Sequence, residues 1–159
     1  MEIDTKIEAL VRETLQAAAN QDIDGFDTAL KAFPDDDARR KGLHVAVAVS
    51  SAALYDMHGG RPSGDQVRET AQALAQAGAW AAVTGEEAMA YLVALVNGSP
   101  LEEALDPQLA VLLIFVMTSA LLNSPRARQR AEGGSWSGYF EQLQGRLRAT
   151  RSGSMRNPA

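Results

Sequence analysis

A strongly apolar stretch, "LAVLLIFVMTSALL", covers residues 109–122 and contains no charged side chain. It is bounded by "LEEALDP" before it and by "NSPRARQR" after it. A membrane-spanning helix needs about 20 apolar residues, so this stretch is too short, and we expect no membrane span. Asp106 and Pro107 are typical of a helix start, and Asn123 to Pro125 are typical of a helix end. The pattern therefore predicts one apolar helix at about 107–123.

Elsewhere, apolar residues recur every three or four positions, which is typical of amphipathic helices. Phe26, Leu30 and Phe33 follow this spacing and predict a short helix that ends before Pro34. The same spacing predicts a last helix with a stripe of Trp136, Phe140, Leu143 and Leu147. Further helix starts are indicated by four potential capping boxes, which are Thr5 with Glu8, Ser63 with Gln66, Thr84 with Glu87, and Ser99 with Glu102.

These elements predict an all-α fold, a single compact bundle of six or seven helices around the central apolar helix. Val45, Val47 and Val49 alternate as in a β-strand, but the alanines around them and the length of the segment favour a helix. We expect a helical domain over residues 1–149 and a disordered basic tail over 150–159, which has little to bury. A helix that is apolar on every side must be surrounded, either by this chain alone or with a second copy on one face.

Candidate catalytic residues are few. The chain has no cysteine, which excludes thiol nucleophiles and thiolate metal sites. His44 and His58 are the two histidines, and on one helix they would lie about 21 Å apart, too far to share a metal ion. The pair Glu86 and Glu87 falls in a first helical turn, where the helix dipole explains negative charge. We therefore predict no catalytic residue, no metal and no cofactor, and an acid–base enzyme built on either histidine is the least favoured hypothesis.

Residues 49–55, "VSSAALY", resemble the turn and recognition helix of the TetR-type helix-turn-helix regulators. This resemblance implies DNA binding, with a helix that opens at Val49. The sequence departs from the family pattern because "HVAVA" stands where a short helix and a glycine turn belong, and no basic residue lies between Lys41 and Arg61. DNA affinity depends largely on basic side chains that neutralise phosphates. The electrostatics therefore disfavour nucleic acid as a partner.

Charge is distributed unevenly along the chain. Residues 1–123 carry eight basic and eighteen acidic side chains, a net charge of −10, whereas residues 124–159 carry seven arginines and two glutamates, a net charge of +5. The basic end should attract something acidic, which could be the body of this protein or a second copy of it. The alternative is a solvated tail whose arginines complement a helix dipole.

The segment "EGGSWSGYFEQL" holds three of the nine aromatic residues, Trp136, Tyr139 and Phe140, close to arginines. Aromatic and arginine side chains dominate the binding energy of protein interfaces. The alternative is that these rings pin the last helix to the core, as the stripe implies, with Tyr139 off the stripe and exposed. The predicted partner-binding residues are Arg126, Arg128, Arg130, Trp136, Tyr139 and Phe140.

The function that these features favour is a non-enzymatic protein-interaction or regulatory module that associates with a protein partner or with a second copy of itself. The alternative is a helical protein that binds a small molecule or a lipid in a pocket between apolar helices, a common place for ligands in bundles. The beginning of the chain, "MEIDTKIEAL", lacks the basic and apolar regions of a secretory signal, so we expect a cytoplasmic protein.

Overall fold

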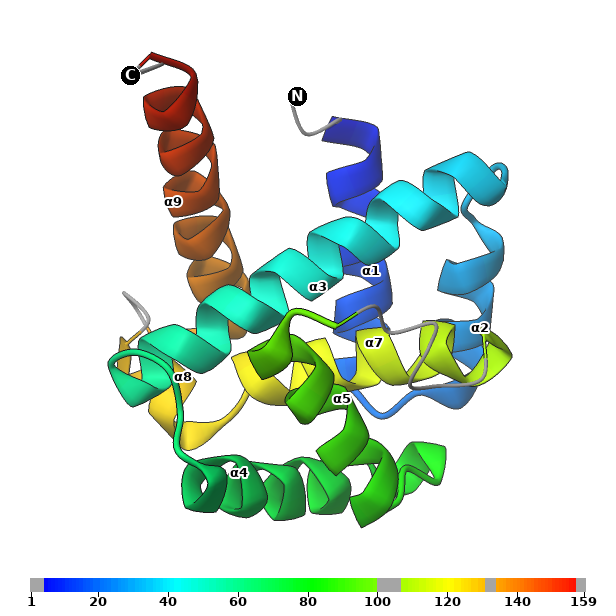
Figure 1. The fold of residues 1–159 in the computed structure, drawn as a ribbon. Coiled ribbons are helices and arrows are strands. Elements are labelled where there is room, and N and C mark those ends of the chain that lie inside the picture. Colours follow the sequence, from blue (N-terminus) through cyan, green and yellow to red (C-terminus); the bar gives the residue numbers. More distant parts are fainter. Residues whose placement is uncertain (1–4, 100–106, 131–133, 157–159) are drawn as a thin grey trace.

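The computed structural model describes residues 5–99, 107–130 and 134–156, with side chains of the last helix described up to Leu147. These residues form α-helices and one short 3-10 helix, so the all-α prediction is confirmed (Figure 1). The elements are α1 (Thr5–Ala19), α2 (Ile23–Lys31), α3 (Asp36–His58), α4 (Gly64–Ala77), the 3-10 helix (Ala79–Ala81), α5 (Gly85–Asn97), α7 (Pro107–Leu122), α8 (Pro125–Arg130) and α9 (Trp136–Arg156). Eight α-helices stand in the described residues where six or seven were expected, since α8 adds a short helix before α9.

Two of the four predicted capping boxes are confirmed, one at the start of α4 and one at the start of α5. Ser63 accepts from the Gln66 N–H at 3.2 Å, and the Gln66 side chain accepts from the Ser63 N–H at 2.9 Å. Thr84 and Glu87 make the same exchange. The box at 99–102 falls mostly outside the described residues. At α1 the carboxylate of Glu8 forms an ion pair with Arg12, and the box with Thr5 stays a prediction because the residues before α1 lie outside the described part of the chain.

The apolar helix α7 is the centre of the molecule, as predicted. It contacts α1, α3, α4, α5, α8 and α9, and its side chains from Leu113 to Ser119 are buried, as are Leu121 and Leu122. Among the described residues of α7, Leu109 is exposed, and Val111, Leu112 and Ala120 are half-buried. Helices of the same chain therefore surround most of α7. In the part of the chain that the structure describes, no helix has the length and apolarity to cross a membrane.

The ambiguous valine segment lies in the middle of α3, which is one continuous helix from Asp36 to His58. The helical interpretation of residues 45–49 is therefore correct. Ala46, Val49 and Ala53 are buried at helical spacing against the core. The resemblance to a helix-turn-helix is wrong in its structural implication, because no turn precedes Val49.

The long helix α3 separates two ends of the molecule. The helix α2 lies at its beginning, while α8 and the start of α9 lie at its other end (Figure 1). The later part of α9 projects away from α3. The backbone of α9 is helical as far as Arg156, into the segment 150–159 for which the sequence predicts disorder, and the domain boundary at residue 149 stays a prediction.

Candidate functional site

The last turn of α3 meets α8 and α9 at the carboxylate of Asp56. One oxygen of Asp56 accepts a hydrogen bond from the Tyr139 hydroxyl at 2.5 Å. The other accepts from Arg146 at 3.0 Å and forms an ion pair with Arg130 at 3.5 Å. These donors stand 74 to 90 residues away from Asp56 in the sequence. A single carboxylate therefore joins three elements that the sequence places far apart.

The electrostatics of this contact favour a charged Asp56 beside a neutral Tyr139. Burial acts to raise the pKa of Asp56, but the hydrogen bonds from Tyr139 and Arg146 and the charges of both arginines outweigh it and lower the pKa below its usual value. Burial and the bond to the Asp56 carboxylate raise the pKa of Tyr139. At neutral pH the phenol therefore remains a donor and the carboxylate an acceptor.

His58, the last residue of α3, holds a further arginine of α8. Its Nδ1 lies 3.2 Å from Nη1 of Arg126, and its Nε2 lies 3.3 Å from the hydroxyl of Thr70. A guanidinium only donates, so Nδ1 must accept and Nε2 carries the hydrogen in this arrangement. Burial and the charge of Arg126 lower the pKa of His58, with Glu69 opposing them. The neutral imidazole is therefore the form that fits.

Four arginines at this end point toward solvent, and we call them the arginine surface: Arg126, Arg128, Arg130 and Arg146. The side chains of Arg130 and Arg146 are 46% and 55% exposed although both contact Asp56. Arg126 and Arg128 are exposed, and Arg128 donates to the side-chain oxygen of Asn123 at 3.2 Å. The structure thus brings the three predicted arginines together at one end.

Arg146 was missed by sequence reasoning. The contact of Arg146 with Asp56 follows from the inward orientation of Tyr139, because residues 139, 142 and 146 share a face of α9 at helical spacing. This face points toward the end of α3, where Tyr139 and Arg146 contact Asp56. A search for two contact faces on the last helix could have found it.

The predicted exposure of Tyr139 is wrong, because its side chain is fully buried. Phe140 is fully buried as well, and Trp136 is half-buried and packs edge-on against it with ring centroids 6.4 Å apart. The helix α9 packs on two sides, against α3 and α7, which buries a residue that a single-stripe interpretation places outside. These aromatic rings therefore pin α9 to the core, as the predicted stripe indicates.

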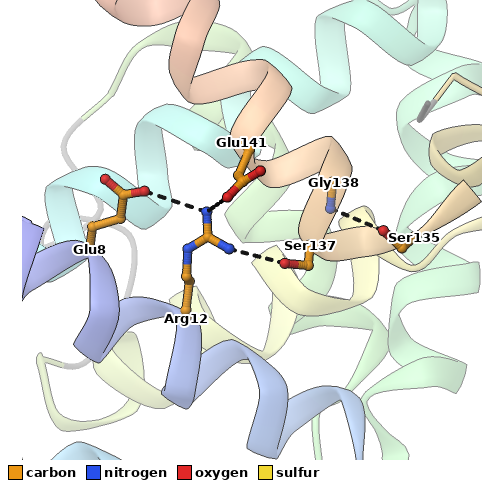
Figure 2. A network of polar contacts seen from close by, with 6 residues as sticks. All are labelled: Glu8, Arg12, Ser135, Ser137, Gly138 and Glu141. Carbon is orange, nitrogen blue, oxygen red and sulfur yellow. Dashed lines mark hydrogen bonds and ion pairs between the residues drawn. The ribbon is translucent and has the colours of Figure 1, made fainter. Parts of the chain in front are cut away.

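Figure 2 shows a second contact that docks α9, in which Arg12 of α1 reaches across to it. The Arg12 guanidinium lies 2.7 Å from Glu141 and donates to the Ser137 hydroxyl at 3.0 Å. The same guanidinium lies 5.1 Å from the centroid of the Phe140 ring. Glu141 is one of two glutamates after residue 123, and this contact directs its charge toward α1.

An apolar hollow adjoins the arginine surface. It is open to solvent, has a volume of about 330 Å³, and is lined by Ala48, Ser51, Ala52 and Tyr55 of α3 and by Leu147 of α9. Tyr55 directly precedes Asp56, and Leu147 directly follows Arg146, so the hollow lies next to the contact between Asp56 and Arg146 along both helices. Together they offer an apolar contact bordered by guanidinium donors, a combination that is common in protein interfaces.

Other candidate groups do not form a comparable site. His44 is exposed and lies on α3 well before His58. Within the described ranges, no three His, Cys, Asp or Glu side chains come together so that they could hold a metal ion. A second hollow of about 510 Å³ lies between α1 and the start of α3, where Lys6, Lys41, Glu13 and Asp37 mix charges of both signs.

Comparison with known proteins identifies no relative. No protein-family model, no curated protein and no solved structure matches the chain.

Proposed function

We propose that this protein is a non-enzymatic interaction module, and that the arginine surface with the adjoining hollow binds an acidic segment of a protein partner. The observation that carries this proposal is that four exposed arginines gather at one end, where Arg130 and Arg146 share the carboxylate of Asp56. Guanidinium groups bind carboxylates through two parallel hydrogen bonds, so an acidic peptide fits this surface.

The arginines are held in place before any partner arrives, which supports the proposal. Tyr139 fixes Asp56, and Asp56 in turn contacts Arg130 and Arg146. Binding loses less conformational entropy when side chains are already ordered. The exposed N–H groups of these guanidiniums can therefore bind a partner at a reduced entropic cost.

Charge balance also supports an acidic partner of protein type. The four arginines of this surface outnumber the carboxylate of Asp56 that contacts two of them, so the surface stays positive. Residues 1–123 carry a net charge of −10, and a long phosphate backbone that extends beyond the arginine surface would meet this negative charge. A short acidic and partly apolar peptide avoids that repulsion.

The proposal is tested by the binding of a fluorescent ten-residue peptide of Asp, Glu and Leu, measured by anisotropy. The double variant Arg126→Gln, Arg128→Gln should bind it about tenfold more weakly, because two exposed charges of about 0.2–1 kcal/mol each are removed. Arg39→Gln with Arg40→Gln, near the beginning of α3, is the matched control and should bind as the unchanged protein does. Equal binding by the Arg126 and Arg128 variant, or tighter binding of a ten-nucleotide single strand, would contradict the proposal.

The alternative of a small apolar ligand has one observation in its favour, the apolar lining of the hollow between α3 and α9. A fatty acid could place its carboxylate on Arg146 and its chain along Leu147. A ligand that binds only the folded state raises the melting temperature as its concentration increases. Dodecanoic acid should produce such a shift if this alternative holds, and Ala48→Glu should remove the shift.

A further inference from the structure

We infer that the acidic partner is a second copy of this chain, whose Ile23, at the start of α2, docks into the hollow between α3 and α9 of the next molecule. The inference rests on the proposed function, because it uses the same arginine surface. Three observations identify the occupant: an exposed apolar side chain, the charges beside it, and the distance between α2 and the hollow.

Ile23 is the most exposed large apolar side chain among the described residues, at 61%, compared with 39% for Val93. The inward face of α2 is supplied by Phe26 and Ala29, which are buried, so Ile23 has no role in packing this helix. An exposed branched side chain at a helix start is a suitable apolar contact for a small open hollow.

Two carboxylates flank this side chain, those of Asp22 and Asp24, and both residues are exposed. Asp22 caps α2 by accepting from the Gly25 N–H at 3.0 Å, which fixes the backbone on both sides of Ile23. We call residues 22–24 the acidic knob. Its apolar side chain is complementary to the apolar hollow, and its carboxylates are complementary to Arg146, which precedes the lining residue Leu147.

A molecule cannot place this knob in its own hollow. The helix α2 lies at the beginning of α3 (Figure 1), and the hollow begins at Ala48, which lies roughly 18 Å along the helix axis from Asp36, so the rigid helix α3 holds the two surfaces apart. The contact must therefore join two molecules. Because the knob and the hollow are different surfaces, the association is head-to-tail and produces open chains or closed rings.

The test uses the full chain in sedimentation velocity over a concentration series, at about 0.05 M and about 0.5 M salt. At low salt the mean mass should rise with concentration beyond twice the 17.0 kDa of one chain, and it should return toward 17.0 kDa at high salt. Ile23→Ser removes the knob, and Ala48→Glu fills the hollow with a negative charge. Each variant alone should remain monomeric.

A mixture of the two variants gives the decisive result. The Ile23→Ser chain retains a hollow and the Ala48→Glu chain retains a knob, so together they should form dimers with the same affinity as one contact between unchanged chains, but nothing larger. Val93→Ser, which removes another exposed apolar side chain, is the matched control and should associate normally. Ser51→Glu replaces Ala48→Glu if circular dichroism shows that the latter does not fold.

Three outcomes would overturn the inference. The first is an unchanged chain that stays monomeric up to about 1 mM, where even weak specific contacts are populated. The others are an Ile23→Ser variant that still associates and a mixture of the two variants that forms no dimer. None of these decides the proposed function, because binding of the synthetic acidic peptide is measured separately. Peptide binding without self-association would leave the interaction module in place with a different acidic partner.

Discussion

Two tyrosines of this protein donate their hydroxyl hydrogens in very different surroundings. Tyr91 of α5 donates to Ser50 at 2.8 Å, and Ser50 lies 2.6 Å from the hydroxyl of Thr118, all inside the core. Tyr139 of α9 donates to Asp56, whose other contacts are exposed arginines. The first network is neutral and buried, and the second contains charged groups that reach the surface.

This difference separates a structural network from the one to which we assign the proposed binding role. In the core network, Thr118 also donates to the backbone oxygen of Ile114 at 2.6 Å, and burial raises the pKa of Tyr91 to about 12. The hydroxyls hold α3, α5 and α7 together and present no polar group to solvent. At the end of α3, Asp56 contacts two guanidiniums whose side chains are 46% and 55% exposed. Only the second arrangement has donors to offer to a partner.

The largest effect should come from placing a carboxylate in the core network. Ser50→Asp is expected to lower the free energy of unfolding by about 3–5 kcal/mol at neutral pH, because no cation lies beside this buried position among the described contacts. Part of this loss should be recovered as the pH falls and the new carboxyl becomes protonated. Urea unfolding followed by circular dichroism at several pH values measures both effects.

The control for this prediction is the next residue of α3. Ser51→Asp introduces the same side chain in the open hollow, where water solvates it, and should change stability by less than about 0.5 kcal/mol. Equal losses at the two positions would contradict the distinction between a dry core network and an open end.

A second prediction removes the same atom from both networks. Tyr139→Phe should lower the free energy of unfolding by about 1.5–3 kcal/mol, since the lost hydrogen bond had a charged acceptor. Tyr91→Phe should cost less, about 0.5–1.5 kcal/mol, because Ser50 and Thr118 still bond to each other. Thermal unfolding of the two variants measures the difference, and a larger loss for Tyr91→Phe would reverse the comparison.

Much of the fold could be predicted because its determinants are local. The apolar helix over 107–123, the capping boxes at Ser63 and Thr84, and the end of α2 before Pro34 depend on residues a few positions apart. The valine segment was ambiguous because β-branched residues also occur in strands, and its buried face shows helical spacing only when alanines and serines are included as core residues.

The site could be predicted only in part, because its determinants are distant in the sequence. The run "RARQR" predicts Arg126, Arg128 and Arg130 as binding residues by composition alone. Nothing local distinguishes Asp56 from the other nineteen acidic residues, and its partner Tyr139 is 83 residues away. The helical spacing of apolar residues identifies one buried face of a helix. The helix α9 packs on two sides, so this spacing does not predict the contact of Tyr139 with Asp56.

The smallest effect concerns the charge of Asp56. Asp56→Asn retains an oxygen that can accept from Tyr139 but loses the attraction to Arg130 and Arg146, and it should cost about 1 kcal/mol at neutral pH because the arginines are partly exposed. The pKa of Asp56 is lower in the folded protein than its ordinary value of 3.8. The unfolded chain therefore binds more protons in this range, and the contribution of the charge is complete above 3.8 and is lost as the pH falls through the folded-state pKa.

The stability difference between the unchanged protein and Asp56→Asn should therefore shrink as the pH falls from 7 to about 3. Urea unfolding across this range measures it, with Asp36→Asn, a 96% exposed position at the other end of α3, as the control that should show less pH dependence. If the difference instead stayed constant, the loss in Asp56→Asn would arise from the shape of the amide and not from its missing charge. The two tyrosine networks would then differ in geometry alone, and the arginines would be held in place by packing.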